Sequence, residues 1–123
     1  MSRSTTANEI LERYASGERS FVGSSLDDEV HDFSCTDLSE ANFSHSFIFA
    51  SFRNANLAGV NFSDANVKTC DFTGANLHGA LFRNAAIDAA VFDGANLEGS
   101  TFEGASEQDH VYAKYELPSR TAA

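Results

Sequence analysis

The sequence has no tryptophan, one proline, two cysteines and few positive charges. Eight Lys and Arg residues stand against 18 Asp and Glu residues, which gives a formal net charge of −10 at pH 7. Nucleic-acid binders neutralise phosphates with Lys and Arg, so this deficit excludes direct nucleic-acid binding and argues against attraction to an anionic membrane surface. No apolar run approaches the ~18 residues that a membrane helix needs. A chain of 123 residues suffices for one domain with one modest core.

The two cysteines, Cys35 and Cys70, are too few for a disulfide framework or a four-ligand zinc site. The first residues also lack the charged-then-apolar order of a secretory signal. We therefore expect a cytoplasmic protein with two reduced thiols.

The sequence does contain a five-residue period. From Phe52 to Phe102 every fifth residue is large and apolar, and a small or compact residue precedes it by two positions. Asn often stands directly before the large residue, and Gly often follows it by two. A period of five fits neither a helix nor a strand, so the chain must turn inside every unit. We expect Gly and Asn to make that turn because both tolerate the backbone conformations of tight corners.

The large residues alternate between Phe and an aliphatic residue, so Phe recurs every ten residues. A coil of four units would stack like on like, which favours an all-β fold, a quadrilateral β-helix of about four coils. Two irregular steps interrupt the period upstream, and we interpret them as changes at corners. They predict an exposed bulge at Asp28–His31 and a distorted corner at Ser46–Ser51. The predicted core residues are Phe33, Leu38, Phe43, Ile48, Phe52, Leu57, Phe62, Val67, Phe72, Leu77, Phe82, Ile87, Phe92, Leu97 and Phe102.

Three runs carry a family resemblance: ANLAG at 55–59, ANLHG at 75–79 and ANLEG at 95–99. They resemble the A-(D/N)-L-x-x signature of the pentapeptide-repeat proteins. The resemblance implies a right-handed β-helix with four sides, in agreement with the period. Some longer members of that family act as DNA mimics that bind gyrase.

The ends of the chain differ from the repeat, which we expect to occupy residues 21–105. Within 1–20, Thr6 and Glu9 have the spacing of a helix capping box, and Ile10, Leu11 and Tyr14 lie on one helical face. This segment predicts an N-terminal α-helix that caps the first coil, with a partner-binding helix as the alternative. Residues 106–123 form a tail that either covers the last coil or makes a homodimer contact.

Catalysis requires converging groups in a concavity, and a narrow, filled prism offers none. We therefore expect no enzyme activity and no cofactor. The acidic stretch 27–32, which includes His31, could hold a cation through oxygen ligands. A solvated acidic loop is the alternative, since the stretch matches no calcium-loop pattern.

These observations predict a non-catalytic scaffold that binds a protein partner, whose identity the sequence does not give. One candidate surface is a line of acidic residues, Asp32, Asp71 and Asp93, on a repeat region with twelve acidic and three basic residues. A DNA-mimicking modulator of gyrase or another topoisomerase is the alternative function, and simple solubility is an alternative role for the charge. The other candidate is Phe47 and Phe49, which either form a binding site or pack locally at the irregular corner.

Overall fold

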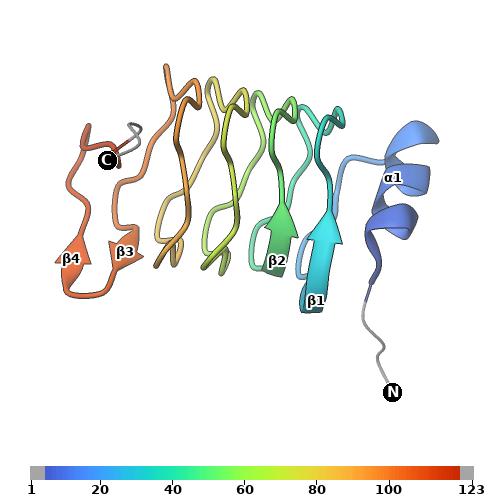
Figure 1. The fold of residues 1–123 in the computed structure, drawn as a ribbon, viewed down its shortest axis with the longest axis horizontal. Coiled ribbons are helices and arrows are strands. Elements are labelled where there is room, and N and C mark those ends of the chain that lie inside the picture. Colours follow the sequence, from blue (N-terminus) through green and yellow to red (C-terminus); the bar gives the residue numbers. More distant parts are fainter. Residues whose placement is uncertain (1–4, 120–123) are drawn as a thin grey trace.

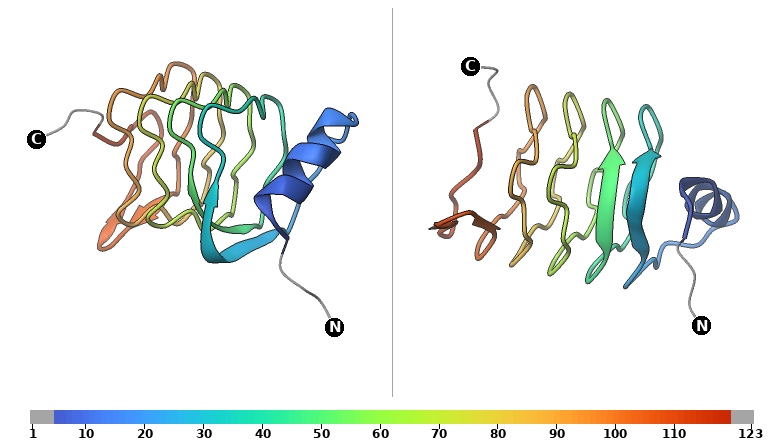
Figure 2. Two further views of the ribbon diagram at one scale, coloured as in Figure 1. Left: turned by 45° about the vertical axis from the view of Figure 1, so that its right-hand side comes forward. Right: turned by 60° about the horizontal axis from the view of Figure 1, so that its bottom comes forward.

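The computed structural model describes residues 5–119 and shows a row of stacked coils with a helix at one end and a hairpin at the other (Figure 1). The helix is α1 (Ala7–Ala15), and the longer strands are β1 (Ser25–Asp32) and β2 (Phe47–Ser51), which pair in parallel. The short strands β3 (Ser106–Glu107) and β4 (His110–Val111) form the antiparallel hairpin. Between β2 and β3 the chain forms coils without longer strands (Figure 2), and single parallel bridges join neighbouring coils.

The bridges define the length of each coil. Asn56, Asn76 and Asn96 are bridged in sequence, so that neighbouring coils are offset by 20 residues, or four five-residue units. Upstream the offset is 19 residues, as between Asn42 and Asn61, and 22 residues between Ser20 and Asn42. These two departures, one residue fewer and two residues more than 20, correspond to the two irregular steps of the period in the sequence.

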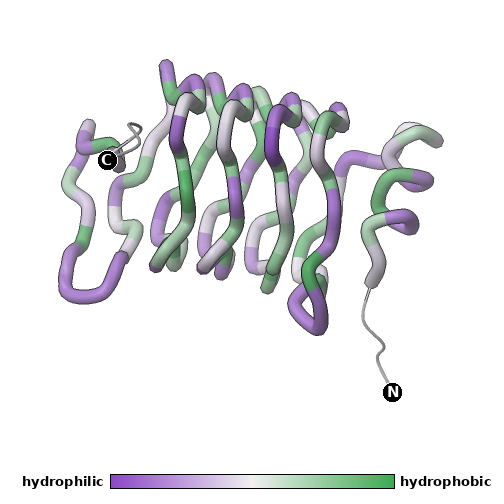
Figure 3. The backbone as a smooth tube through the Cα atoms, in the orientation of Figure 1, coloured by the Kyte–Doolittle hydropathy of each residue, from purple (hydrophilic) through white to green (hydrophobic). Residues whose placement is uncertain are grey.

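The large residue of each unit points to the axis of the coil. All fifteen predicted core residues are buried, and so are Phe21 and Leu26. Phe72 stacks on Phe52 and Phe92 with ring centroids 5.2 and 5.1 Å apart, while Phe62 meets it edge-on at 5.8 Å. Hydrophobic and hydrophilic residues consequently alternate along every coil (Figure 3). Each coil buries its neighbour's apolar face, so no coil could be stable alone.

Gly and Asn take part in the corners, as the sequence predicts, but Asn does so in two ways. Outside β1 and β2, the residue two positions after the large residue adopts a left-handed backbone, as Gly74 (φ 68°) and Asn54 (φ 57°) do. The Asn that precedes the large residue acts through its side chain instead: Oδ1 of Asn56 accepts the N–H of Ala58 at 3.2 Å. This Asn therefore closes the turn as a hydrogen-bond acceptor and does not itself adopt the left-handed conformation.

The expectation of an exposed bulge at Asp28–His31 is wrong in one respect. These residues lie in β1, where residues 27–30 stand opposite the single residue Phe49, and His31 is buried. His31 precedes Phe33 by two positions, and in most of the other units this position points inward and holds a small residue. Its Nε2 lies 3.1 Å from Oδ1 of Asp28. The predicted distorted corner at Ser46–Ser51 is likewise mostly strand β2.

A helix covers the first coil of the stack, and a hairpin covers part of the last coil. Oγ1 of Thr6 accepts the N–H of Glu9 at 3.1 Å and caps α1, whose Ile10 is buried against the core. At the other end Tyr112 follows β4 and lies over Phe102, with ring centroids 6.1 Å apart. Among residues 5–119, no helix is long and apolar enough to cross a membrane.

Candidate interaction surface

Strand β2 presents two aromatic side chains to solvent. Ile48 and Ala50 point inward, so the alternating Phe47 and Phe49 point outward, with 53% and 37% of their surface exposed. Val30 comes from the extra residues of β1 that stand opposite Phe49, and it is 59% exposed. We call Val30, Phe47 and Phe49 the β1–β2 surface. Both rings therefore reach the surface, and a binding role for the pair stays a prediction.

The β1–β2 surface has an acidic border. Asp27, Asp28 and Glu29 precede Val30 in β1 and are exposed. Exposed aromatic groups beside carboxylates are complementary to a partner that carries both apolar and cationic side chains.

The predicted acidic line is interrupted. Asp32 and Asp71 lie in one column of the wall with Ser51 between them, but Val91 follows in that column. Asp93 comes two residues after Val91, at the corner. Within the line, Oδ2 of Asp71 accepts a hydrogen bond from Nη1 of Arg53 at 2.9 Å. The three carboxylates therefore do not form one continuous stripe.

Local hydrogen bonds keep two of these carboxylates ionised. The Ser34 hydroxyl and N–H both donate to Asp32 and lower its pKa. Partial burial of Asp71 acts to raise its pKa, but hydrogen bonds from Thr73 and Arg53 outweigh it and hold the pKa below the ordinary value. Both groups consequently carry charge throughout the neutral range.

Groups suited to metal binding do not converge in the part of the chain that the structure describes, where no three His, Cys, Asp or Glu residues could hold an ion together. In the acidic stretch 27–32, Nε2 of His31 lies 3.1 Å from Oδ1 of Asp28. His45, His78 and His110 each face a separate carboxylate, at 3.7, 4.0 and 2.6 Å. A two-residue pair is too small a ligand set for a structural cation site.

The two thiols occupy different environments. Cys35 is exposed, whereas Cys70 is buried and its Sγ donates to the carbonyl of Ile48 at 3.3 Å. Burial raises the pKa of the Cys70 thiol to about 12. Because the thiolate is the reactive form, Cys70 is a packing residue and not a nucleophile.

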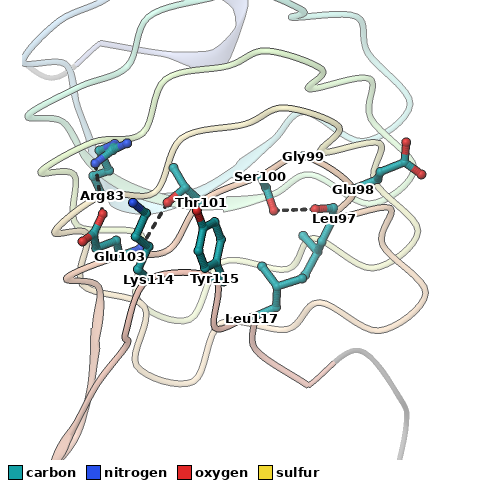
Figure 4. Close-up of a pocket in the computed structure, with 10 residues that line it drawn as sticks. All are labelled: Arg83, Leu97, Glu98, Gly99, Ser100, Thr101, Glu103, Lys114, Tyr115 and Leu117. Carbon is teal, nitrogen blue, oxygen red and sulfur yellow. Dashed lines mark hydrogen bonds and ion pairs between the residues drawn. The ribbon is translucent and has the colours of Figure 1, made fainter.

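Sequence reasoning missed a pocket of about 430 Å³ between the last coil and the tail (Figure 4). Leu97 and Gly99 line it on the coil side, and Tyr115 and Leu117 on the tail side. The sequence did contain one signal for this pocket. Leu117 follows Leu97 by twenty residues, the length of one full coil, so the tail could be expected to return over Leu97.

Comparison with known proteins identifies the family. The family model for pentapeptide repeats matches residues 32–79 and 70–106 of the chain, with eight copies. The chain belongs to the pentapeptide repeat family. Membership of this family, predicted from the three A-N-L runs, is confirmed.

Solved structures of other pentapeptide repeat proteins are similar. A pentapeptide repeat protein from the thylakoid lumen of Arabidopsis thaliana is 31% identical with a TM-score of 0.66, and the match covers 71% of this chain and 60% of that one. HetL, a pentapeptide repeat protein involved in heterocyst differentiation regulation in the cyanobacterium Nostoc sp. strain PCC 7120, is 24% identical with a TM-score of 0.49, over 82% of this chain and 44% of HetL. The chain thus spans less than two thirds of either protein. No curated protein sequence gave a significant match.

Proposed function

We propose that this pentapeptide repeat protein is a non-catalytic cytoplasmic scaffold, a right-handed β-helix of about four coils, that binds a protein partner through the β1–β2 surface. The observation that carries the proposal is the outward pair Phe47 and Phe49 on one strand. Aromatic side chains that protrude together are typical of the centres of protein interfaces. The acidic residues 27–29 beside them favour a partner with Lys or Arg around an apolar patch.

The test compares partner capture by three forms of the full chain: the natural sequence, the double variant Phe47→Ser and Phe49→Ser, and the control Val91→Ser. Val91 is also an exposed apolar residue (38%) but lies on a later coil. A protein captured from the host by the natural chain should then be purified and its affinity measured. We expect the double variant to weaken binding at least ~10-fold and the control to leave it unchanged. Equal binding by all three forms would contradict the proposal.

The charge of the repeat region supports a second candidate, a DNA-mimicking modulator of gyrase or another topoisomerase. Arg53 and Arg83, two of its three basic residues, are paired with Asp71 and Glu103 at 2.9 and 3.3 Å, so the surplus of carboxylates is left facing solvent. A gyrase supercoiling assay tests this function. If the protein inhibits or protects gyrase and this effect weakens with added salt, the result supports DNA mimicry. No effect on gyrase at a micromolar excess of the protein excludes it.

A further inference from the structure

The two ends of the coil stack are closed in different ways. At the N-terminal end, the N–H of Thr5 and the hydroxyl of Tyr14 donate to carbonyls of the first coil, at 3.0 and 2.9 Å. At the C-terminal end, Tyr112 accepts from Gly104 at 2.9 Å and donates to Ala105 at 2.8 Å. These two bonds close only the wall of the last coil that leads into the hairpin.

The preceding wall ends with an open row of backbone groups. In the interior, Leu77 and Gly79 donate their N–H groups to carbonyls of the next coil, at 2.8 and 2.9 Å. Leu97 and Gly99 hold the same positions one coil later, and within residues 5–119 neither N–H has a hydrogen-bond partner. The carbonyl of Ala95, on the same side, has none there either. Unused ladder groups of this kind form a template for another strand.

The tail lies beside this row without bonding to it. Glu116 accepts from the N–H of Ala113 at 2.9 Å and contacts His110 at 2.6 Å, so its bonds are local to the tail. Tyr115 and Leu117 stand across the pocket from the last coil (Figure 4). A volume of about 430 Å³ is within the range of ligand sites and accommodates a short extended segment.

We propose that this open row, formed by Ala95, Leu97 and Gly99 and called here the C-terminal edge, binds an extended segment of a partner protein as an added parallel strand. In such binding, main-chain hydrogen bonds supply affinity and side-chain positions supply specificity. The edge repeats the parallel register of the interior coils, whereas a twofold pair of chains would bring two copies of it together antiparallel. A second copy stacked head to tail would have to present its first coil, which α1 covers.

The columns below the edge indicate the sequence that it accepts. Nδ2 of Asn96 donates to Oδ1 of Asn76 at 3.4 Å, so an Asn on the incoming strand extends the ladder. Leu97 is already fully buried, and Leu117 of the tail lines the same pocket, so an aliphatic residue of the incoming strand takes the place of Leu117 beside Leu97. Glu98 is exposed and lies 4.0 Å from His78 in the coil below, which favours a cation stacked above it. The preferred motif is therefore Asn, an aliphatic residue, then Lys or Arg.

The experiment uses the full ¹⁵N-labelled chain and the synthetic peptide GANLKGA. Binding should shift the amide signals of Leu97 and Gly99 and slow their hydrogen exchange at least ~10-fold at saturation. The amides of Leu77 and Gly79, which are already bonded, provide the internal control. A peptide with Asp in place of Leu should bind ~10-fold more weakly or not at all.

A charge swap adds specificity to the test. Glu98→Lys should weaken the binding of GANLKGA about two- to fivefold, as expected for the loss of an exposed ion pair. The same variant should strengthen the binding of GANLEGA by a similar factor. The matched control is Asp64→Lys, at an exposed position on an earlier coil. This variant should not change the affinity for either peptide.

The proposal is overturned if millimolar peptide leaves Leu97 and Gly99 unchanged, or if these amides are protected without peptide in proportion to protein concentration. The latter result would assign the edge to a second copy of the chain. The proposal goes beyond the β1–β2 surface and does not depend on it. The Phe47→Ser and Phe49→Ser variant should bind the peptide normally, so the two proposals fail independently.

Discussion

At the scale of single residues, position within the five-residue unit decides the environment of a side chain. Cys35 and Cys70 show this clearly. Cys35 follows Phe33 by two positions and has the left-handed backbone of a corner (φ 58°), so it is exposed. Cys70 precedes Phe72 by two and takes the buried place of a small residue.

The first prediction concerns these thiols. At pH 8 a disulfide reagent such as DTNB should modify one thiol of the native protein, Cys35, because burial keeps the Cys70 pKa at about 12. Two thiols should react in denaturant, and the variant Cys35→Ser should show no reaction until it unfolds. Modification of both thiols at equal rates in the native state would contradict the assigned positions.

The second prediction concerns the corner glycines. Gly79 (φ 69°) has open space around an added Cβ, whereas a Cβ on Gly74 (φ 68°) would overlap Oδ1 of Asn54. Gly79→Ala should therefore cost about 1 kcal/mol for the left-handed backbone alone. Gly74→Ala should cost about 1 kcal/mol more because Asn54 must move. Urea unfolding measures both, and equal losses would show that the overlap has no consequence.

At the scale of elements, the turn of each unit depends on a side-chain acceptor. Asn56 and Asp71 both use Oδ1 to accept the N–H two residues on, from Ala58 and Thr73. An Asp in this position adds a charge to the same turn. The pH dependence of stability should therefore differ between Asn and Asp versions of one unit.

The third prediction follows from the lowered pKa of Asp71. A carboxylate whose pKa is lower in the folded than in the unfolded state stabilises the fold above the unfolded pKa, about 4. That contribution is lost as the pH falls through the lowered value. Asp71→Asn keeps the acceptor for Thr73, so its free energy of unfolding should fall less between pH 7 and pH 3 than that of the natural chain.

Urea unfolding at the two pH values checks the third prediction. Thr73→Val retains the Asp71 charge but removes one hydrogen bond to it, so it should reduce the acid sensitivity only in part. An Asp71→Asn variant as acid-sensitive as the natural chain would show that the local hydrogen bonds do not stabilise the ionised group.

The five-residue period identified the large residues that are buried. It did not predict the course of the backbone at every irregular step. The columns of Phe and aliphatic residues follow from spacing alone, because a 20-residue coil leaves one inward position per unit for a large side chain. His31 was misplaced because its position was judged from the surrounding acidic residues. Its place two residues before Phe33 predicts burial, as the structure shows.

The candidate sites were less predictable than the core. The outward direction of both Phe47 and Phe49 depends on β2 continuing through the irregular step, where a corner was expected. The hairpin and the open C-terminal edge depend on the chain reversing after residue 107, where the five-residue period no longer gives information.

At the scale of the whole molecule, the fold is a row of coils whose ends are unlike. Helix α1 closes the first coil through its buried Ile10 and its hydrogen bonds, and the hairpin closes part of the last. In such a stack each coil is stabilised by its neighbours, so the loss of one central side chain affects the entire solenoid.

The central claim, that one large side chain in every five is buried along the axis, is tested most directly by the free energies of unfolding of Phe72→Ala and Phe47→Ala in urea. Phe72 contacts aromatic rings in both neighbouring coils, so its truncation should cost about 3–5 kcal/mol. Phe47 is exposed, and its truncation should change stability by no more than about 0.5 kcal/mol. Similar losses for the two variants, or a larger loss for Phe47→Ala, would contradict the account.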